Sequence, residues 1–142
     1  HGVMRVASGT IALAAGDQSA GDTAMLAQIP TNASIVSLKI YNDDLDTGTD
    51  STLNVGLWSA DGNVTAVDAD AYASVVTDLR GVVTVGTELG FEARNVNKMG
   101  QQLWADAGLD ADPGGYYLVG LQFAAAGDAG GDVSWLITYV VN

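Results

Sequence analysis

The sequence predicts a mainly β protein, an antiparallel β-sandwich with one or two short helices in its connections. Its 142 residues suit a single domain. Six short runs alternate apolar and polar residues with a period of two, which places successive side chains on opposite faces of a strand. Clusters of Gly, Asp, Asn and Pro separate the runs, without the regular strand–helix alternation of a parallel sheet.

The first two runs are short strands by composition. Residues 5–16 set Ile11 and Leu13 among small side chains, and residues 22–30 alternate until Pro30. Proline has no backbone N–H to donate to a sheet, so the second strand is expected to end there.

The third run, residues 34–42, is rich in β-branched side chains. Val36, Leu38 and Ile40 recur at every second position, so we expect them to share one buried face.

The fourth run, residues 51–59, carries the clearest alternation in the chain. Leu53, Val55 and Leu57 fall on one face, which we expect to be buried. The Asp-Gly pair at 61–62 follows directly and is the strongest two-residue hairpin signal in the sequence.

The last two strands are predicted within residues 115–126 and 132–142, joined by a Gly- and Asp-rich loop. In the second of them Trp135, Ile137 and Tyr139 share a face, and we expect that face to lie in the core.

Two segments interrupt the strands with helical spacing. Residues 67–81 could form a short helix, because their apolar residues recur three and four positions apart and Gly81 could end it. A second helix is expected over residues 96–107, where an apolar stripe includes Trp104 and Gly108 follows as a stop signal.

The composition argues against several partners. With 5 basic and 17 acidic residues the net charge is −12, so the chain would repel nucleic acid and anionic membranes. No apolar run reaches the length of about 18 residues that spans a bilayer. Only 15% of residues are charged, against about 25% in a typical domain. Two explanations stay open: a surface partly covered by partners, or an Ala- and Gly-rich acidic protein from a high-GC or saline source.

Catalytic chemistry has few candidates. His1 is the only histidine and lies at the chain end, where an imidazole is poorly oriented, and there is no cysteine. A conventional zinc site is therefore not expected, and no cofactor is predicted. A carboxylate enzyme would need Glu88 and Glu92 on the walls of one cleft, and their sequence context gives no sign of one. We therefore predict that the protein is not an enzyme.

The acidic stretch NDDLDTGTD, residues 42–50, has two interpretations. The spacing fails the calcium-binding EF-hand pattern, because Gly48 and Val55 stand where ligands are required. An irregular calcium loop remains the alternative. The favoured interpretation is a hydrated loop between two strands, with Asx turns at its start. The carboxylates concerned are Asp43, Asp44, Asp46 and Asp50.

The three tryptophans are either core residues or partner anchors. Trp135 and Trp104 are expected in the core. Trp58 lies opposite the Leu53 and Leu57 face, so it is the better candidate for an interface or a helix contact.

Four phrases carry a resemblance over most of the chain, from about Ser8 to Tyr139: SLKIYNDDLDTGTDSTLNVGLW, DADAYAS, GTELGFEAR and GQQLWADAGLDADPGGYYLVGL. Together they resemble small virion structural proteins of tailed bacteriophages, of the head decoration or cement type. The resemblance implies a β-sandwich or jelly-roll-like domain that binds the outer surface of the capsid, often as a homotrimer. The implied partners are the major capsid protein and further copies of the chain. The family carries no catalytic residues to transfer.

Residues 1–8 are predicted to form an N-terminal arm, followed by a single β-sandwich domain over residues 9–142. A flexible end can become ordered along a neighbouring surface. The arm is therefore a candidate clamp; a disordered or processed tail is the alternative. The candidate residues for a capsid or oligomer interface are Val3, Met4, Arg5, Val6 and Trp58.

A second function remains open: a tail, fibre or other virion surface module that binds host glycans. Such a module needs an exposed aromatic platform. The residues that could supply one are Trp58, Tyr72, Tyr116 and Tyr117.

Overall fold

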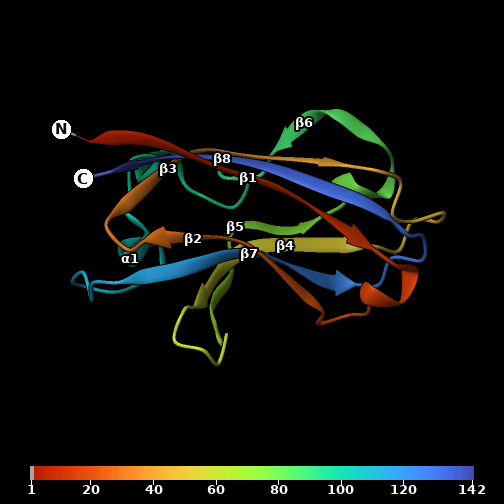
Figure 1. Ribbon diagram of the computed structural model, residues 1–142, viewed down its shortest axis with the longest axis horizontal. Helices are drawn as coiled ribbons and strands as arrows, with labels where there is room; N and C mark the ends of the chain where they lie inside the picture. The colour runs from red at the N-terminus through yellow and green to blue at the C-terminus, as the bar shows by residue number, and fades with distance from the viewer. Residues whose placement is uncertain (1) are drawn as a thin grey trace.

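The computed structural model describes residues 2–142 and consists of two four-stranded antiparallel sheets packed face to face (Figure 1). One sheet has the order β1-β8-β3-β6 and the other β2-β7-β4-β5. The strands are β1 (Val3–Leu13), β2 (Thr23–Pro30), β3 (Ala33–Asn42), β4 (Thr52–Ser59), β5 (Ala66–Val76), β6 (Val83–Glu88), β7 (Tyr116–Ala125) and β8 (Gly131–Val141).

This strand order defines an eight-stranded jelly roll. The chain passes between the two sheets at most connections, and strands distant in sequence, such as β1 and β8, lie side by side. Both ends of the chain lie at one end of the sandwich (Figure 1). The predicted antiparallel sandwich is therefore confirmed.

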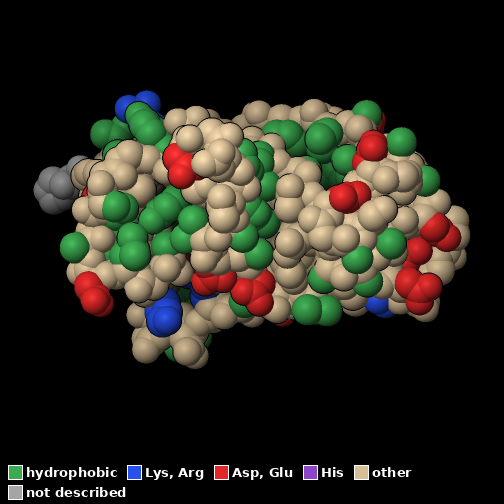
Figure 2. Space-filling model, turned by 90° about the horizontal axis from the view of Figure 1, so that it is seen from below, with side chains coloured by type: hydrophobic (Ala, Val, Ile, Leu, Met, Phe, Trp, Pro, Cys, Tyr) green, Lys and Arg blue, Asp and Glu red, His purple; other side chains and the backbone are tan. Residues whose placement is uncertain are grey.

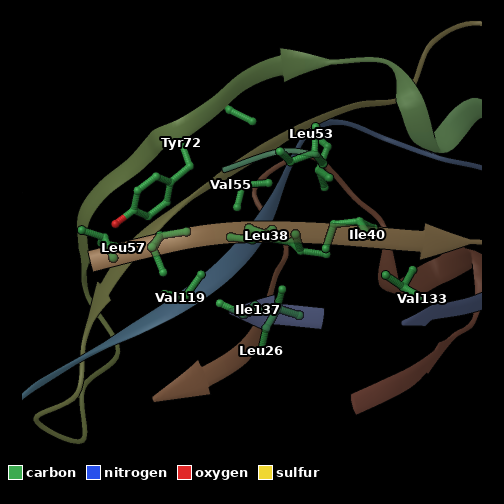
Figure 3. Packing of buried hydrophobic residues seen from close by; sticks show 14 of the residues in the cluster. Leu26, Leu38, Ile40, Leu53, Val55, Leu57, Tyr72, Val119, Val133 and Ile137 are labelled. Carbon is green, nitrogen blue, oxygen red and sulfur yellow. The ribbon is translucent and has the colours of Figure 1, made fainter. Parts of the chain in front are cut away.

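The core lies between the sheets and comes from the alternation seen in the sequence. Leu53, Val55 and Leu57 of β4 are at most 1% exposed and face Leu38 and Ile40 of β3 (Figure 3). Burying one such side chain contributes roughly 1.5–3 kcal/mol.

The third strand departs from strict alternation at one position. The register between β3 and β8 shifts between Ile35 and Ser37, and this bulge turns Val36 outward to 43% exposure while Ile35 is buried. The expectation that Val36 shares the buried face of Leu38 is therefore wrong.

The first predicted helix is also wrong, because residues 66–76 form β5. The β4–β5 register runs from Val55 opposite Ala73 to Leu57 opposite Asp68, so β5 carries extra residues in a bulge. A bulge breaks the period of two and produced the helical spacing read from the sequence. Only a single 3₁₀ turn, η2 (Asp78–Arg80), follows.

The second predicted helix is present only in part. The segment forms a 3₁₀ turn, η3 (Val96–Lys98), and one α-helical turn, α1 (Leu103–Asp106). Between them Gln102 is extended, and its backbone bridges to Ser34 at the start of β3. Pairing with the sheet replaces the helical hydrogen bonds there.

Two features near the sheet edges were not anticipated. Strand β6 was missed, and it forms the edge next to β3. Residues 3–8, expected as an arm, form the first half of β1 and pair with β8 along their whole length. His1 lies outside the described residues.

The hairpin between β4 and β5 is found where the Asp-Gly pair predicted it. Its connection covers residues 60–65 rather than two residues, and Gly62 takes a positive φ of 95°. Within residues 2–142, no helix has the length and apolar character needed to cross a bilayer.

Candidate functional site

The candidate interface residues of the N-terminal segment lie on an edge strand. Val3, Met4 and Val6 are 57%, 63% and 59% exposed, and Arg5 is also exposed. β1 is paired on one side only, with β8. An edge strand with exposed apolar side chains is a surface that other chains can bind.

The exposed apolar residues continue onto the neighbouring strand. Met4 lies opposite Val140, and Leu136 lies opposite Ser8, on the outward-facing side of the sheet. From Met4 to Thr10 and from Ser134 to Val140 no residue is acidic. We call this outward surface of β1, β8 and β3 the β1–β8–β3 face.

Seven of the 17 acidic residues lie in loops at the end of the sandwich opposite the termini (Figure 1). The loops are tied together: the Gln18 amide donates to the Ala129 carbonyl at 2.6 Å, and Thr47 donates to both carboxylate oxygens of Asp128 at 2.7 Å. The carboxylates of these loops are Asp17, Asp22, Asp43, Asp44, Asp46, Asp50 and Asp128. These seven carboxylates therefore lie away from the β1–β8–β3 face.

Trp58 is not available as a surface anchor. It is 2% exposed, on β4 between Leu118 of β7 and Ala66 of β5. Gly56, on the same outward side of β4, lies directly against the backbone of Asp68 in β5. β5 folds over this side of β4, so Trp58 belongs to the interior and not to an interface.

The acidic loop is organised by hydrogen bonds to backbone N–H groups. Asp46 is only 3% exposed, and its carboxylate accepts from Gly48, Asp50 and Ser51 at 3.3, 2.9 and 2.8 Å. The bond from Ser51 is the main reason why the pKa of Asp46 is lowered. The expected Asx-turn chemistry is present, but the expectation that all four acids stay hydrated is wrong for Asp46.

The loop does not assemble a recognisable metal centre. Within residues 2–142 no group of three or more Asp, Glu or His side chains is placed to hold a metal ion. The carboxylate of Asp43 accepts from the Asp132 N–H at 2.8 Å, and that of Asp44 from the Asp46 N–H at 3.1 Å. Whether the loop binds calcium is tested by chelation with EDTA.

The two glutamates form hydrogen bonds with different strands. Glu88 accepts from the backbone N–H of Leu38 at 2.8 Å and from the Ser37 hydroxyl at 2.6 Å. Glu92 accepts from the Ser74 N–H at 2.9 Å. Glu88, at the end of β6, thus bonds to β3, and Glu92, in the loop that follows, bonds to β5; both contacts are structural.

A buried ionic cluster was missed in the sequence. Arg94 and Asp106 form an ion pair at 3.0 Å, with side chains 2% and 4% exposed, and the Tyr72 hydroxyl donates to Asp106 at 2.8 Å. The guanidinium carbon of Arg94 lies 5.4 Å from the ring centres of Tyr72 and Phe91. Asp106 lies in the segment expected as a helix and Arg94 lies just before it, and nothing in their spacing relates them to Tyr72.

Electrostatics in this cluster are dominated by burial. Burial raises the pKa of Asp106 to about 6, and the Tyr72 hydrogen bond and the Arg94 charge oppose the rise. Burial also raises the pKa of Tyr72 well above its ordinary value. Asp68, close by on β5, has its pKa raised by burial and by Asp70. Through Tyr72, the cluster holds the segment of residues 91–106 against β5.

The cavity beside this cluster is about 320 Å³ and polar. Its charged lining residues are the acids Asp68, Asp70 and Asp106 and the bases Arg94 and Lys98. Within residues 2–142 the Arg94 Nε and Nη1 atoms have no hydrogen-bond partner although they are buried. The mixture of charges gives no single ligand class a clear advantage.

Comparisons with known proteins identify the fold. No family model matches the sequence, and no curated protein sequence matches it. A chain of the cyanophage Pam1 capsid asymmetric unit is 23% identical, with a TM-score of 0.64, and the match covers 99% of this chain and 86% of that one. A chain from the capsid of Ralstonia phage GP4 is 24% identical, with a TM-score of 0.68 and coverage of 99% and 85%.

A third match is more distant. A chain of the acid-stable capsid of Helicobacter pylori bacteriophage KHP30 is 10% identical, with a TM-score of 0.51 and coverage of 99% and 90%. All three matches cover 99% of this chain and 85–90% of the matched chain, so they include the complete jelly roll of this chain and not a fragment of it. The fold of this chain is thus a jelly roll that also occurs in chains of phage capsids.

Proposed function

We propose that this chain is a virion structural protein of a tailed phage that decorates the outer surface of the capsid as a homotrimer and catalyses no reaction. The single observation that carries the proposal is the end-to-end match of the whole fold to chains of three phage capsid structures. The matches cover 85–90% of the matched chains, so those chains are small as well.

The surface supports assembly as the mechanism. The β1–β8–β3 face presents Met4, Val6 and Leu136 without acidic neighbours, in a chain of net charge −12. Apolar burial contributes roughly 25 cal/mol per Å², while association entropy and desolvation offset most of that gain. Because three subunits are linked in the proposed trimer, a weak contact made by each of them gives a much higher overall affinity.

The proposed interface includes the first half of β1, with Val3, Met4, Arg5 and Val6. In the folded chain this segment is an edge strand and not a free arm. It would therefore contact a capsid subunit or a second copy as a preformed surface, which avoids the cost of ordering a flexible segment.

The test mixes the purified protein with particles of its own phage that were assembled without it, and measures occupancy and solution mass. We expect a trimer that saturates the particles. Occupancy should stay level or rise from low to physiological salt, because bound copies of charge −12 repel each other less when screened. A chain that remains monomeric and binds no particle at any salt refutes the proposal.

A matched pair of variants locates the contact. Val6→Asp places a charge on the β1–β8–β3 face, whereas Val85→Asp places one on β6, at the other edge of the same sheet, where Val85 is 84% exposed. Val6→Asp should lower particle affinity or trimer stability at least tenfold, and Val85→Asp should leave both unchanged. Equal effects of the two variants would exclude β1 from the interface.

A further inference from the structure

A second surface site lies on the opposite sheet. A cavity of about 420 Å³ opens on the outer side of β2 and β7, beside the β4–β5 connection. Its walls are Gln28 of β2, residues 59–61 at the end of β4, and residues 113–117, which lead into β7. Figure 2 looks at the molecule from this side and shows apolar side chains gathered over part of the face, with acidic side chains along its margins.

The cavity has an aromatic wall. Tyr116 is 52% exposed and points outward from β7, while Tyr117 beside it is 9% exposed and faces inward. An exposed tyrosine ring offers an apolar face and a polar hydroxyl at the same place. Both are residues that the sequence had marked as possible platforms.

The wall is held rigid by its own hydrogen bonds. Asp112 accepts from the Thr31 hydroxyl at 2.6 Å and from the Gly114 N–H at 2.9 Å. Gly114 and Gly115 have φ angles of 75° and 82°, which other residues adopt only at a cost. The tight turn fixes the position of Tyr116 relative to β2.

Polar groups of Gln28 and Asp61 line the cavity together with the Tyr116 hydroxyl. Within residues 2–142 the Gln28 amide and the Tyr116 hydroxyl make no hydrogen bond to the rest of the chain. Asp61 accepts at Oδ1, from the Ser59 hydroxyl at 3.0 Å and the Asn63 N–H at 3.2 Å, which leaves Oδ2 free.

We propose that this cavity binds a neutral hexopyranose, a single sugar unit of a glycan. The C–H face of the sugar ring stacks on the Tyr116 side chain. The sugar hydroxyl groups donate to Asp61 and exchange hydrogen bonds with Gln28. An apolar wall with a few converging polar groups is the usual form of a small-ligand site, and a volume of about 420 Å³ lies within the usual range.

Charge selects against acidic sugars. The lining contains the carboxylate of Asp61 and no lysine or arginine, and Asp112 lies next to Gly114. A uronic or sialic acid would bring its carboxylate close to these groups without a cation to pair with. Neutral sugars avoid that cost.

The site is independent of the proposed attachment to the capsid. It lies on the outer side of the β2-β7-β4-β5 sheet, and the β1–β8–β3 face lies on the other sheet of the sandwich. A subunit attached through one face would leave the other free to hold a cell-surface glycan. The inference therefore adds a function and does not depend on attachment.

The test is a titration of the ¹⁵N-labelled protein followed by backbone amide NMR. The probes are the methyl α-pyranosides of glucose, mannose and galactose, and N-acetylglucosamine, each to about 100 mM, which saturates a site with a Kd of about 10 mM. At least one probe should shift amides of residues 28, 59–61 and 114–117. The absence of such shifts with all four probes would overturn the proposal.

Variants separate binding from folding. Tyr116→Ala should raise Kd at least tenfold, whereas Tyr116→Phe, which keeps the stacking ring, should stay within about threefold. Leu136→Ala, on the other sheet, should not change Kd, and the NMR spectrum of each variant reports its fold. Undiminished binding by folded Tyr116→Ala, or binding of glucuronic acid as tight as that of the methyl glucoside, would contradict the assignment. Particle binding by Tyr116→Ala should be normal, which keeps this test distinct from that of attachment.

Discussion

Replacing Asp106 with asparagine should reduce the pH dependence of folding stability. Asp106 is 4% exposed and lies between Arg94 and the Tyr72 hydroxyl. Its pKa is about 6 in the folded chain, against an ordinary value of 3.8, because burial disfavours the carboxylate more than its partners favour it. The folded state therefore holds this proton more tightly than the unfolded state does.

The sign follows from proton linkage. A carboxyl whose pKa is raised on folding stabilises the protein fully below pH 3.8 and loses that contribution as the pH rises through about 6. At about 1.4 kcal/mol for each pH unit of difference, the complete loss is about 3 kcal/mol, of which about 2 kcal/mol falls between pH 4.5 and pH 7.5. For a domain of this size that corresponds to roughly 4–8 °C in Tm.

The assay is chemical denaturation of wild type and Asp106→Asn at a series of pH values from 4.5 to 7.5. The wild type should lose about 2 kcal/mol more than the variant over this range. Asp68, whose pKa is also raised, is present in both proteins, so its own contribution is largely common to the two curves. In the variant Arg94 faces a neutral amide at every pH, so the two proteins differ in absolute stability, and the slope is the measured quantity.

Two outcomes would refute the reasoning. Parallel curves for wild type and variant would mean that Asp106 does not titrate in this range. A wild type that gains stability relative to the variant as the pH rises would mean that the ion pair with Arg94 outweighs burial and holds the pKa of Asp106 below its ordinary value.

Three further predictions concern the backbone and the acidic loop. Gly56→Ala should destabilise the fold by about 1–3 kcal/mol, because a Cβ there meets the β5 backbone, while Gly100→Ala, with open space around it, should cost far less in the same denaturation assay. Val75 has a φ of 53°, so Val75→Gly should raise stability by up to about 1 kcal/mol, whereas the same change at Val85 on β6 should not; a loss at Val75 would argue against strain there. EDTA should leave Tm unchanged, and a drop of several degrees that calcium alone restores would establish a metal site at residues 43–50.

The sequence predicted the sandwich because strand alternation is a local property. Leu53, Val55 and Leu57 recur at every second position, and all three are buried as expected. The period is set by the geometry of a single strand and needs no knowledge of its neighbours. Ile137 follows the same rule in β8, with Trp135 and Tyr139 packed partly against the core.

The alternation failed where strand pairing is irregular. Tyr72 and Ala73 are adjacent in β5 and both fully buried, which departs from the alternation of a strand with one solvent-exposed face. In this bulge a short stretch of β4 pairs with a longer stretch of β5, so the bulge depends on how the two strands pair. A single sequence gives no sign of it, so the segment resembled a helix.

The sites depend on contacts between distant residues. Tyr72 and Asp106 are 34 positions apart, and the jelly-roll connections bring them within hydrogen-bonding distance. Tyr116 meets Gln28 and Asp61 only because β7 lies between β2 and β4. The sequence by itself determined six of the eight strands and most of their core-facing side chains, because both depend on residue type and local spacing. The tertiary structure decided which strands pair, that Trp58 is covered, and where polar and aromatic groups meet, because those depend on the order in which the strands are brought together.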